Sequence, residues 1–101
     1  MTEKEKMKEG LWYDANNDQE LIDQRLVCQD LCFALNQLKP SDERRNEIIE
    51  KILGYFPDNL VLLSPFTADY GKNIKLGKNV FVNINNYFMD GAFIEIGDNV
   101  F

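Results

Sequence analysis

The 101-residue sequence contains no histidine, so it lacks the side chain that most often acts as a general base near neutral pH. No apolar run approaches the length of a bilayer span. The charged opening, residues 1–6 (MTEKEK), is not followed by the apolar core of a secretion signal. From these absences we expect a soluble, cytoplasmic protein without a membrane partner.

Cysteine is also scarce, because only Cys28 and Cys32 are present, four residues apart in a helical pattern. This is not the spacing of a C-x-x-C pair, and no second pair or histidine completes a zinc set. We therefore expect no metal site and interpret the two cysteines as small, partly buried side chains.

Basic residues are outnumbered, with 11 Lys and Arg against 17 Asp and Glu, and the net charge is −6. Nucleic acid and anionic membranes are therefore poor partners. The Arg44-Arg45 pair stands among many carboxylates, so a solvated face is the expected role for it rather than phosphate binding. An apolar fraction of 45% with 12% aromatic residues argues against disorder.

An internal repeat organises the C-terminal part of the sequence. Ile74–Phe81 (IKLGKNVF) returns as Ile94–Phe101 (IEIGDNVF), and five of the eight positions are identical. Segments rich in β-branched residues and interrupted by Gly and Asn are typical of short strands broken by turns.

Aliphatic anchors recur with a six-residue spacing inside this repeat. Leu76, Val82 and Phe88 are six residues apart, and Ile96 resumes the series after a slip of two residues. Anchors at every sixth residue are the hexapeptide pattern of a parallel β-helix, in which three hexads make a triangular coil of about eighteen residues. An ordinary β-meander is the alternative. The β-helix predicts that the four anchors point inward and that the two copies pair parallel and in register.

Three helices are predicted before the repeat, over 2–9, 17–38 and 41–53. The expected N-caps are Thr2, Asn17 and Ser41. Gly54 is the expected stop of the third helix ahead of Pro57. The buried stripe of the second helix is predicted from apolar residues at helical spacing: Val27, Leu31, Ala34, Leu35 and Leu38. These patterns predict a helical segment over 1–57 and the first coils of a β-helix over 58–101, a mainly β fold with an α-helical N-terminal segment.

The ordered set of motifs resembles the maltose and galactoside O-acetyltransferases, which are hexapeptide-repeat acyltransferases. The motifs are LWYDA after the first helix, Pro65-Phe66, DYGKNI from Asp69, FVNIN from Phe81 and the acidic Asp90. The resemblance implies a left-handed parallel β-helix and a homotrimer with active sites between neighbouring subunits. It also implies acetyl transfer from acetyl-CoA to a sugar hydroxyl. The pair Asn86-Tyr87 departs from the more apolar family pattern, which leaves the identity of the sugar open.

The resemblance also implies which residues contact the sugar acceptor: Asp14, Asp69, Asn83 and Asp90. Carboxylates and amides suit the paired hydroxyl groups of a sugar. Each residue has a structural alternative: Asp69 and Asp90 can each cap a turn before a glycine-containing segment, and Asn83 can satisfy backbone groups at a corner. Asp14 follows aromatic residues whose role is packing. The family's catalytic histidine and most of its coenzyme site lie beyond the region present here, so no catalytic residue is assigned.

Two functions of different classes follow from this interpretation. The first is the N-terminal portion of a sugar O-acetyltransferase that supplies acceptor-binding residues but lacks the catalytic base. The second is a non-catalytic sugar-binding or oligomerisation module.

We predict that the 101-residue chain does not transfer acetyl groups from acetyl-CoA to maltose, glucose or galactosides. A carboxylate with a pKa of about 4 is a weak base for a sugar hydroxyl, and loss of a positioned general base costs about 10²–10⁴ in rate. A thiol-release assay with acetyl-CoA checks this, run beside a longer version that continues through further coils and includes a histidine. Equal turnover by the two proteins would contradict the prediction.

Overall fold

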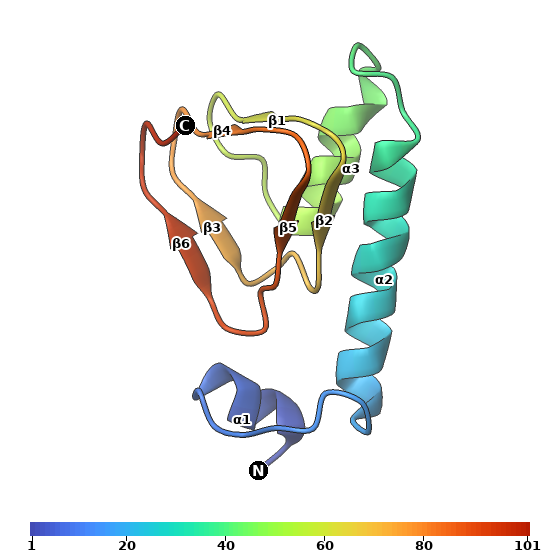
Figure 1. The fold of residues 1–101 in the computed structure, drawn as a ribbon, viewed down its shortest axis with the longest axis vertical. Helices are drawn as coiled ribbons and strands as arrows, with labels where there is room; N and C mark the ends of the chain where they lie inside the picture. Colours follow the sequence, from blue (N-terminus) through green and yellow to red (C-terminus); the bar gives the residue numbers. More distant parts are fainter.

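The structure, a computed structural model, describes all residues from 1 to 101, with three helices first and six short strands after them (Figure 1). The helices are α1 (Glu3–Lys8), α2 (Gln19–Asn36) and α3 (Arg44–Leu53). They agree with the three predicted helices, and no boundary differs by more than three residues. None of them combines the length and the apolar composition that a bilayer crossing requires.

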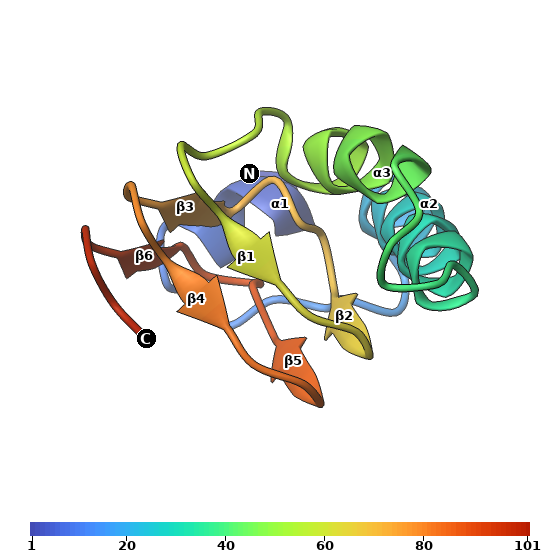
Figure 2. The ribbon, with the colours of Figure 1, turned by 90° about the horizontal axis from the view of Figure 1, so that it is seen from above.

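The six strands have two or three residues each and form three separate parallel pairs. They are β1 (Val61–Leu62), β2 (Phe66–Ala68), β3 (Ile74–Leu76), β4 (Phe81–Val82), β5 (Asn86–Phe88) and β6 (Ile94–Ile96). β1 pairs with β4, β2 with β5 and β3 with β6, so one coil of chain lies directly on the next (Figure 2). The predicted parallel pairing of the two sequence copies is confirmed, because Ile74 lies opposite Ile94.

The coil is longer than the predicted eighteen residues. Val61 lies opposite Phe81 and Phe66 opposite Asn86, so the register is 20 residues. The longest step within the coil runs from the start of β2 at Phe66 to the start of β3 at Ile74. That step contains the turn Asp69–Asn73, so the two-residue slip seen in the sequence adds length to a corner rather than to a strand.

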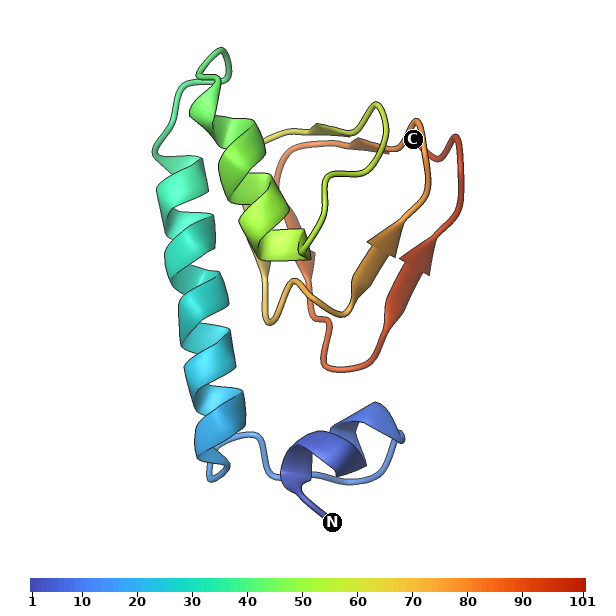
Figure 3. The ribbon, with the colours of Figure 1, turned by 180° about the vertical axis from the view of Figure 1, so that it is seen from behind.

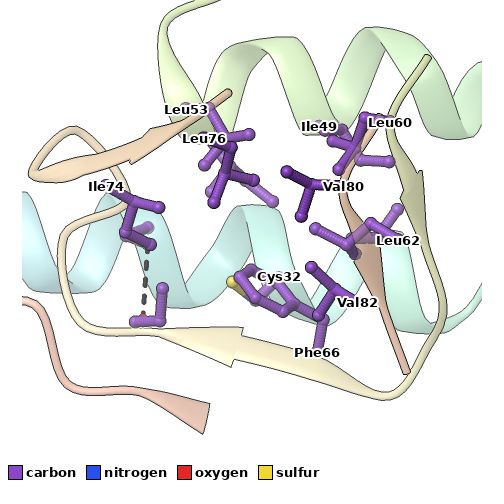
Figure 4. Packing of buried hydrophobic residues seen from close by; sticks show 14 residues of the cluster. Cys32, Ile49, Leu53, Leu60, Leu62, Phe66, Ile74, Leu76, Val80 and Val82 are labelled. Carbon is purple, nitrogen blue, oxygen red and sulfur yellow. Dashed lines mark hydrogen bonds between the residues drawn. The ribbon is translucent and has the colours of Figure 1, made fainter. Parts of the chain in front are cut away.

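One hydrophobic core is shared by α2, α3 and the inside of the coils (Figure 4). Its fourteen buried members are Cys28, Cys32, Leu35, Ile49, Ile52, Leu53, Leu60, Leu62, Phe66, Ala68, Ile74, Leu76, Val80 and Val82. The anchors Leu76 and Val82 are buried, and Phe88 and Ile96 are partly buried against the same core, so the predicted inward direction of the four anchors is confirmed.

The predicted buried stripe of α2 is only partly right. Leu35 is buried as expected, but Val27 is 61% exposed and Ala34 is also exposed. The buried face instead runs through Cys28 and Cys32, which were predicted to be partly buried and are 2% exposed each. Small side chains at these positions let α2 pack closely on β2, and the Cys28 thiol donates to the Ala68 carbonyl at 3.4 Å.

Two of the predicted helix caps are wrong. Asp18 caps α2 by accepting from the Leu21 amide at 3.2 Å, because the Asn17 side chain is engaged with Asp14 instead. Ser41 does not cap α3, whose N-cap is Glu43 without a side-chain hydrogen bond. The Thr2 cap and the left-handed Gly54 stop, with φ of 89°, are confirmed.

The expectation of a solvated Arg44-Arg45 face holds for Arg44 only. Arg45 is 7% exposed and donates to the Leu62 carbonyl at 2.7 Å and to the Ser64 hydroxyl at 2.8 Å. Its guanidinium therefore joins α3 to the segment that follows β1, where a backbone carbonyl in a two-residue strand would otherwise lack a partner.

Asparagines form a ladder along one corner of the coils. Asn59, Asn79 and Asn99 have φ of 55°, 58° and 60°, the left-handed region that a short polar side chain tolerates. Asn59 Nδ2 donates to Asn79 Oδ1 at 2.9 Å, and Asn79 Nδ2 donates to Asn99 Oδ1 at 3.0 Å. The ladder repeats with the 20-residue register and holds successive corners in line.

We predict that Asn79→Ala lowers the free energy of unfolding by about 1–3 kcal/mol. Alanine loses both side-chain hydrogen bonds of Asn79 and is strained at this positive φ. Asn79→Gly should cost less, since glycine adopts positive φ without strain. Urea denaturation measures both, with Asn46→Ala on the exposed surface of α3 as a near-neutral control. Equal losses for the alanine and glycine variants would show that backbone strain is not the cause.

Candidate functional site

The turn Asp69–Asn73 between β2 and β3 is fixed by hydrogen bonds to Asp90 of the next coil. Asp90 is completely buried under this turn. Its Oδ1 accepts from the Tyr70 amide at 2.8 Å, and its Oδ2 accepts from the Asn73 amide at 3.3 Å. Asn73 Nδ2 returns a hydrogen bond to the Asp90 carbonyl at 2.8 Å. One side chain therefore fixes the backbone of the turn.

Burial has an electrostatic consequence for Asp90. Desolvation raises the pKa of its carboxyl above the usual value, while hydrogen bonds from the backbone amides of the turn act in the opposite direction. Because the pKa in the folded state is raised, this carboxyl favours folding most at acidic pH, and its contribution is lost as the pH rises through that pKa. At neutral pH the charge costs stability, and the amides of the turn offset part of that cost.

The same turn is joined to the end of α3. Gly71 has φ of +77°, and a Cβ there would lie 2.3 Å from the Ile52 carbonyl oxygen, so no larger residue fits. Next to it, Lys72 Nζ donates to the carbonyls of Lys51 and, at 3.1 Å, Ile52. These carbonyls are among the last of the helix, where a cation is favoured.

Asp69 lies at the start of the turn and binds a tyrosine from the next coil. Tyr87 Oη donates to Asp69 Oδ1 at 2.5 Å, and the Asp69 amide donates to the Phe88 carbonyl at 3.2 Å. The hydrogen bond to Asp69 raises the pKa of Tyr87 to about 12, because the carboxylate stabilises the neutral phenol. The Tyr87 side chain is 53% exposed, so its ring remains available at the surface.

The loop after α1, which carries Asp14, is connected to the turn through the neighbours of Asp14 in sequence. Arg25 donates to the Ala15 carbonyl at 2.8 Å and to the Tyr70 hydroxyl at 3.0 Å, and its guanidinium lies 5.9 Å from the Tyr70 ring centroid. The hydroxyl of Tyr13, the residue before Asp14 in the sequence, lies against Gly91. The loop therefore touches both coils at the position of Asp90.

Asp14 itself is exposed and closes a local turn. Its Oδ1 accepts from the Asn16 amide at 3.0 Å, and its Oδ2 accepts from Asn17 Nδ2 at 2.5 Å. The hydrogen bond from Asn17 and then that from Asn16 lower the pKa of Asp14. The Asp14 amide is held in turn by Glu3 Oε2 at 3.1 Å.

Asn83 lies at a different corner, between β4 and β5. Its Oδ1 accepts from the Ile84 amide at 2.8 Å, and its carbonyl accepts from Asn86 Nδ2 at 2.8 Å. The whole of β5 separates it from Asp90. The structure thus brings Asp69 and Asp90 together at one turn, leaves Asp14 in a loop whose neighbours Tyr13 and Ala15 connect to the same region, and places Asn83 one strand away from Asp90.

Two residues at this turn were not assigned to the site from the sequence. Arg25 joins α2, the loop and Tyr70, and it is the one basic residue of α2, which is a signal that a sequence analysis can use. Tyr87 was noted only as a departure from the family pattern, and its contact with Asp69 depends on the register of β2 and β5.

The side chains of this region offer hydrogen-bond acceptors and an aromatic surface. They do not form a pair suited to proton transfer. Carboxylate oxygens of Asp14 and Asp69 can accept hydrogen bonds from hydroxyl groups, and the Tyr87 ring offers an apolar face beside them. Nowhere in the structure do three His, Cys, Asp or Glu side chains converge as a metal site requires.

Stacked parallel strands with hexad anchors, joined to a helical N-terminal segment, are the architecture of a hexapeptide-repeat protein. Residues 6–57 match the family model of the maltose acetyltransferase hexapeptide capping motif, which is half of the chain. The chain therefore belongs to the maltose acetyltransferase family and corresponds to its N-terminal part.

Curated relatives of similar sequence carry names of the same kind. Putative acetyltransferase SH0499 of Staphylococcus haemolyticus is 56% identical over 92 residues, and SAR2635 of Staphylococcus aureus is 57% identical over 95 residues. These matches cover 90% and 93% of this chain but 48% of each relative. The chain thus spans about half the length of the curated relatives it matches.

Solved structures are similar over almost the whole chain. A maltose O-acetyltransferase from Clostridium difficile is 39% identical with a TM-score of 0.91, over 98% of this chain and 53% of that one. A hexapeptide-repeat acetyltransferase from Vibrio cholerae, complexed with acetyl coenzyme A, is 32% identical with a TM-score of 0.80, over 96% and 52% of the two chains.

We predict that Asp69→Asn lowers the pKa of Tyr87 from about 12 back towards the ordinary value of about 10. Because the pKa in the folded state is raised, the stability that this hydrogen bond contributes is complete below pH of about 10 and is lost as the pH rises towards 12. Tyrosine Cζ resonances, followed by NMR through an alkaline titration, measure the shift. Tyr55 serves as the control, because it is bonded to backbone groups of Leu76 and the substitution removes none of its hydrogen bonds. An unchanged Tyr87 titration in Asp69→Asn would contradict the assigned hydrogen bond.

Proposed function

We propose that this chain is the N-terminal portion of a sugar O-acetyltransferase, which transfers the acetyl group of acetyl-CoA to a hydroxyl of maltose, glucose or a galactoside. The observation that carries this proposal is the position of Asp69 and the exposed ring of Tyr87, which are hydrogen-bonded to each other at the turn that buried Asp90 holds. Carboxylates beside an aromatic face suit the paired hydroxyls and apolar C–H face of a sugar.

In this proposal Asp14, Asp69, Asn83 and Asp90 form the acceptor-binding part, as the family resemblance implies. Asp90 acts through the turn that it holds, because its side chain is buried and both oxygens accept backbone hydrogen bonds. We add Tyr87 and Arg25 to this part because of their contacts with Asp69 and with the loop of Asp14. Tyr87 orients Asp69 and offers its ring, and Arg25 fixes the loop that carries Asp14.

The proposal includes four further features: a left-handed sense for the coils, a homotrimer with sites between subunits, a cytoplasmic location and acetyl-CoA as co-substrate. It also includes the division of this chain into a helical segment, 1–57, and the first coils of the β-helix, 58–101. The family resemblance implies a histidine as the general base, and this chain contains no histidine.

A non-catalytic binding or oligomerisation module is the second candidate. It is favoured by the exposed apolar side chains on and around the second coil, namely Ile84, Tyr87, Met89 and Phe93. Exposed apolar side chains on one coil are available to contact another molecule.

A fusion tests the first function. Residues 1–101 joined to the C-terminal half of the Staphylococcus haemolyticus relative should acetylate a sugar, and Asp69→Asn in the fusion should lower kcat/KM by about 10–100-fold, as expected for loss of a hydrogen bond to a charged group. Asp58→Asn, an exposed carboxylate in the loop before β1, is the control. A fusion that folds and binds acetyl-CoA but acetylates no sugar supports the non-catalytic module. Equal kcat/KM for Asp69→Asn and the control would remove Asp69 from the acceptor site.

A further inference from the structure

A cavity of about 500 Å³ is lined by residues of α1, α2, the end of α3 and the Asp69–Asn73 turn. Figure 3 shows the backbone of the three helices from behind. None of the four proposed acceptor-binding residues lines it. Its volume is within the range of small-molecule sites in proteins. Its walls come from segments far apart in sequence, from Lys4 in α1 to Phe93 after β5.

Half of the residues that line this cavity are hydrophobic, and its charged residues are almost all basic. The apolar lining includes Met7, Val27, Cys28, Leu31, Ile52 and Phe93. Four lysines line it as well, Lys4, Lys8, Lys51 and Lys72, against one acidic residue, Asp23. In a chain with a net charge of −6 this is a local reversal of sign. Such a reversal favours an anionic ligand.

Two of the four lysines are already engaged. Lys4 pairs with Glu20 at 3.0 Å, and Lys72 donates to the carbonyls at the end of α3. Lys8 and Lys51 form no ion pair and donate no side-chain hydrogen bond in the structure. Asp23 is partly satisfied by Gln19 Nε2 at 2.7 Å. The ammonium groups of Lys8 and Lys51 are therefore free to bind an anion.

We propose that this lysine-rimmed cavity binds an amphipathic monocarboxylate, a fatty carboxylate of medium chain length. The apolar tail covers the wall formed by Val27, Leu31 and Phe93, and the carboxylate is bound by Lys8 and Lys51 at the rim. Burial of methylene groups drives the association, and charge-assisted hydrogen bonds select the anion.

The ligand used for the test is decanoate, kept below its micelle-forming concentration and titrated into the 101-residue chain. Calorimetry gives the affinity, and amide NMR shifts at Val27, Leu31 and Phe93 give the location. Octanoate should bind about tenfold more weakly, because two methylene groups fewer are buried. Decanol, which has no charge, should also bind at least about tenfold more weakly than decanoate.

Variants distinguish specific binding of decanoate in this cavity from non-specific binding elsewhere on the protein. The double variant Lys8→Gln/Lys51→Gln should weaken decanoate binding about tenfold or more, and Val27→Glu should abolish it by placing a negative charge on the wall. Lys39→Gln and Phe33→Glu are the matched controls, since both positions lie outside the cavity and are exposed. Val27 is also exposed, so its substitution leaves the core intact.

Three outcomes would overturn the proposal: no saturable binding of decanoate, equal binding of decanol and decanoate, or equal losses in the control variants. Asp69→Asn should leave decanoate binding unchanged, because Asp69 does not line the cavity. A loss of decanoate binding in Asp69→Asn would assign the ligand to the proposed acceptor site instead. The result is therefore independent of whether the chain proves to be part of an acetyltransferase.

Discussion

The 20-residue register between successive coils is the constraint on which the other contacts depend. It places Ile74 over Ile94, aligns Asn59, Asn79 and Asn99 in a hydrogen-bonded ladder, and brings the Tyr70 amide onto the Asp90 carboxylate. Because side chains alternate in direction along a strand, a slip of one residue would turn the apolar anchors outward and the polar residues inward. Strands of two or three residues have too few backbone hydrogen bonds to fix this register alone. Hydrogen bonds between corner residues and packing in the core therefore fix the register together.

The Asp69–Asn73 turn is where the separate parts of the molecule meet. Asp90 holds it from the next coil, Gly71 and Lys72 join it to the end of α3, and Tyr70 connects it through Arg25 to α2 and the loop of Asp14. The proposed acceptor site and the lysine-rimmed cavity both border this one turn. A change in its backbone would therefore alter both surfaces, whereas substitutions at Tyr87 or Lys51 would alter one of them.

At Asp90 the cost of burying a carboxylate is partly offset by hydrogen bonds from backbone amides. Its carboxylate is removed from water, which raises its pKa, and it gains amide donors that only this turn geometry can supply. Tyr87 and Asp69 are arranged differently, because their hydrogen bond lies at the surface and leaves the aromatic ring exposed. The first contact stabilises the frame of the proposed site, and the second presents groups to a ligand.

The sequence alone determined the helices, the parallel β-helix pattern, the inward anchors and the family, because these follow from local spacing of apolar, capping and turn residues. It could not determine the length of the coil, since extra residues in a corner leave the strand pattern unchanged. Nor could it assign the roles of Arg45, Asp90, Arg25 and Tyr87. Their partners lie 10 to 45 residues away in the chain. Only the folded arrangement decides whether such a polar side chain is buried in a hydrogen-bond network or exposed to solvent.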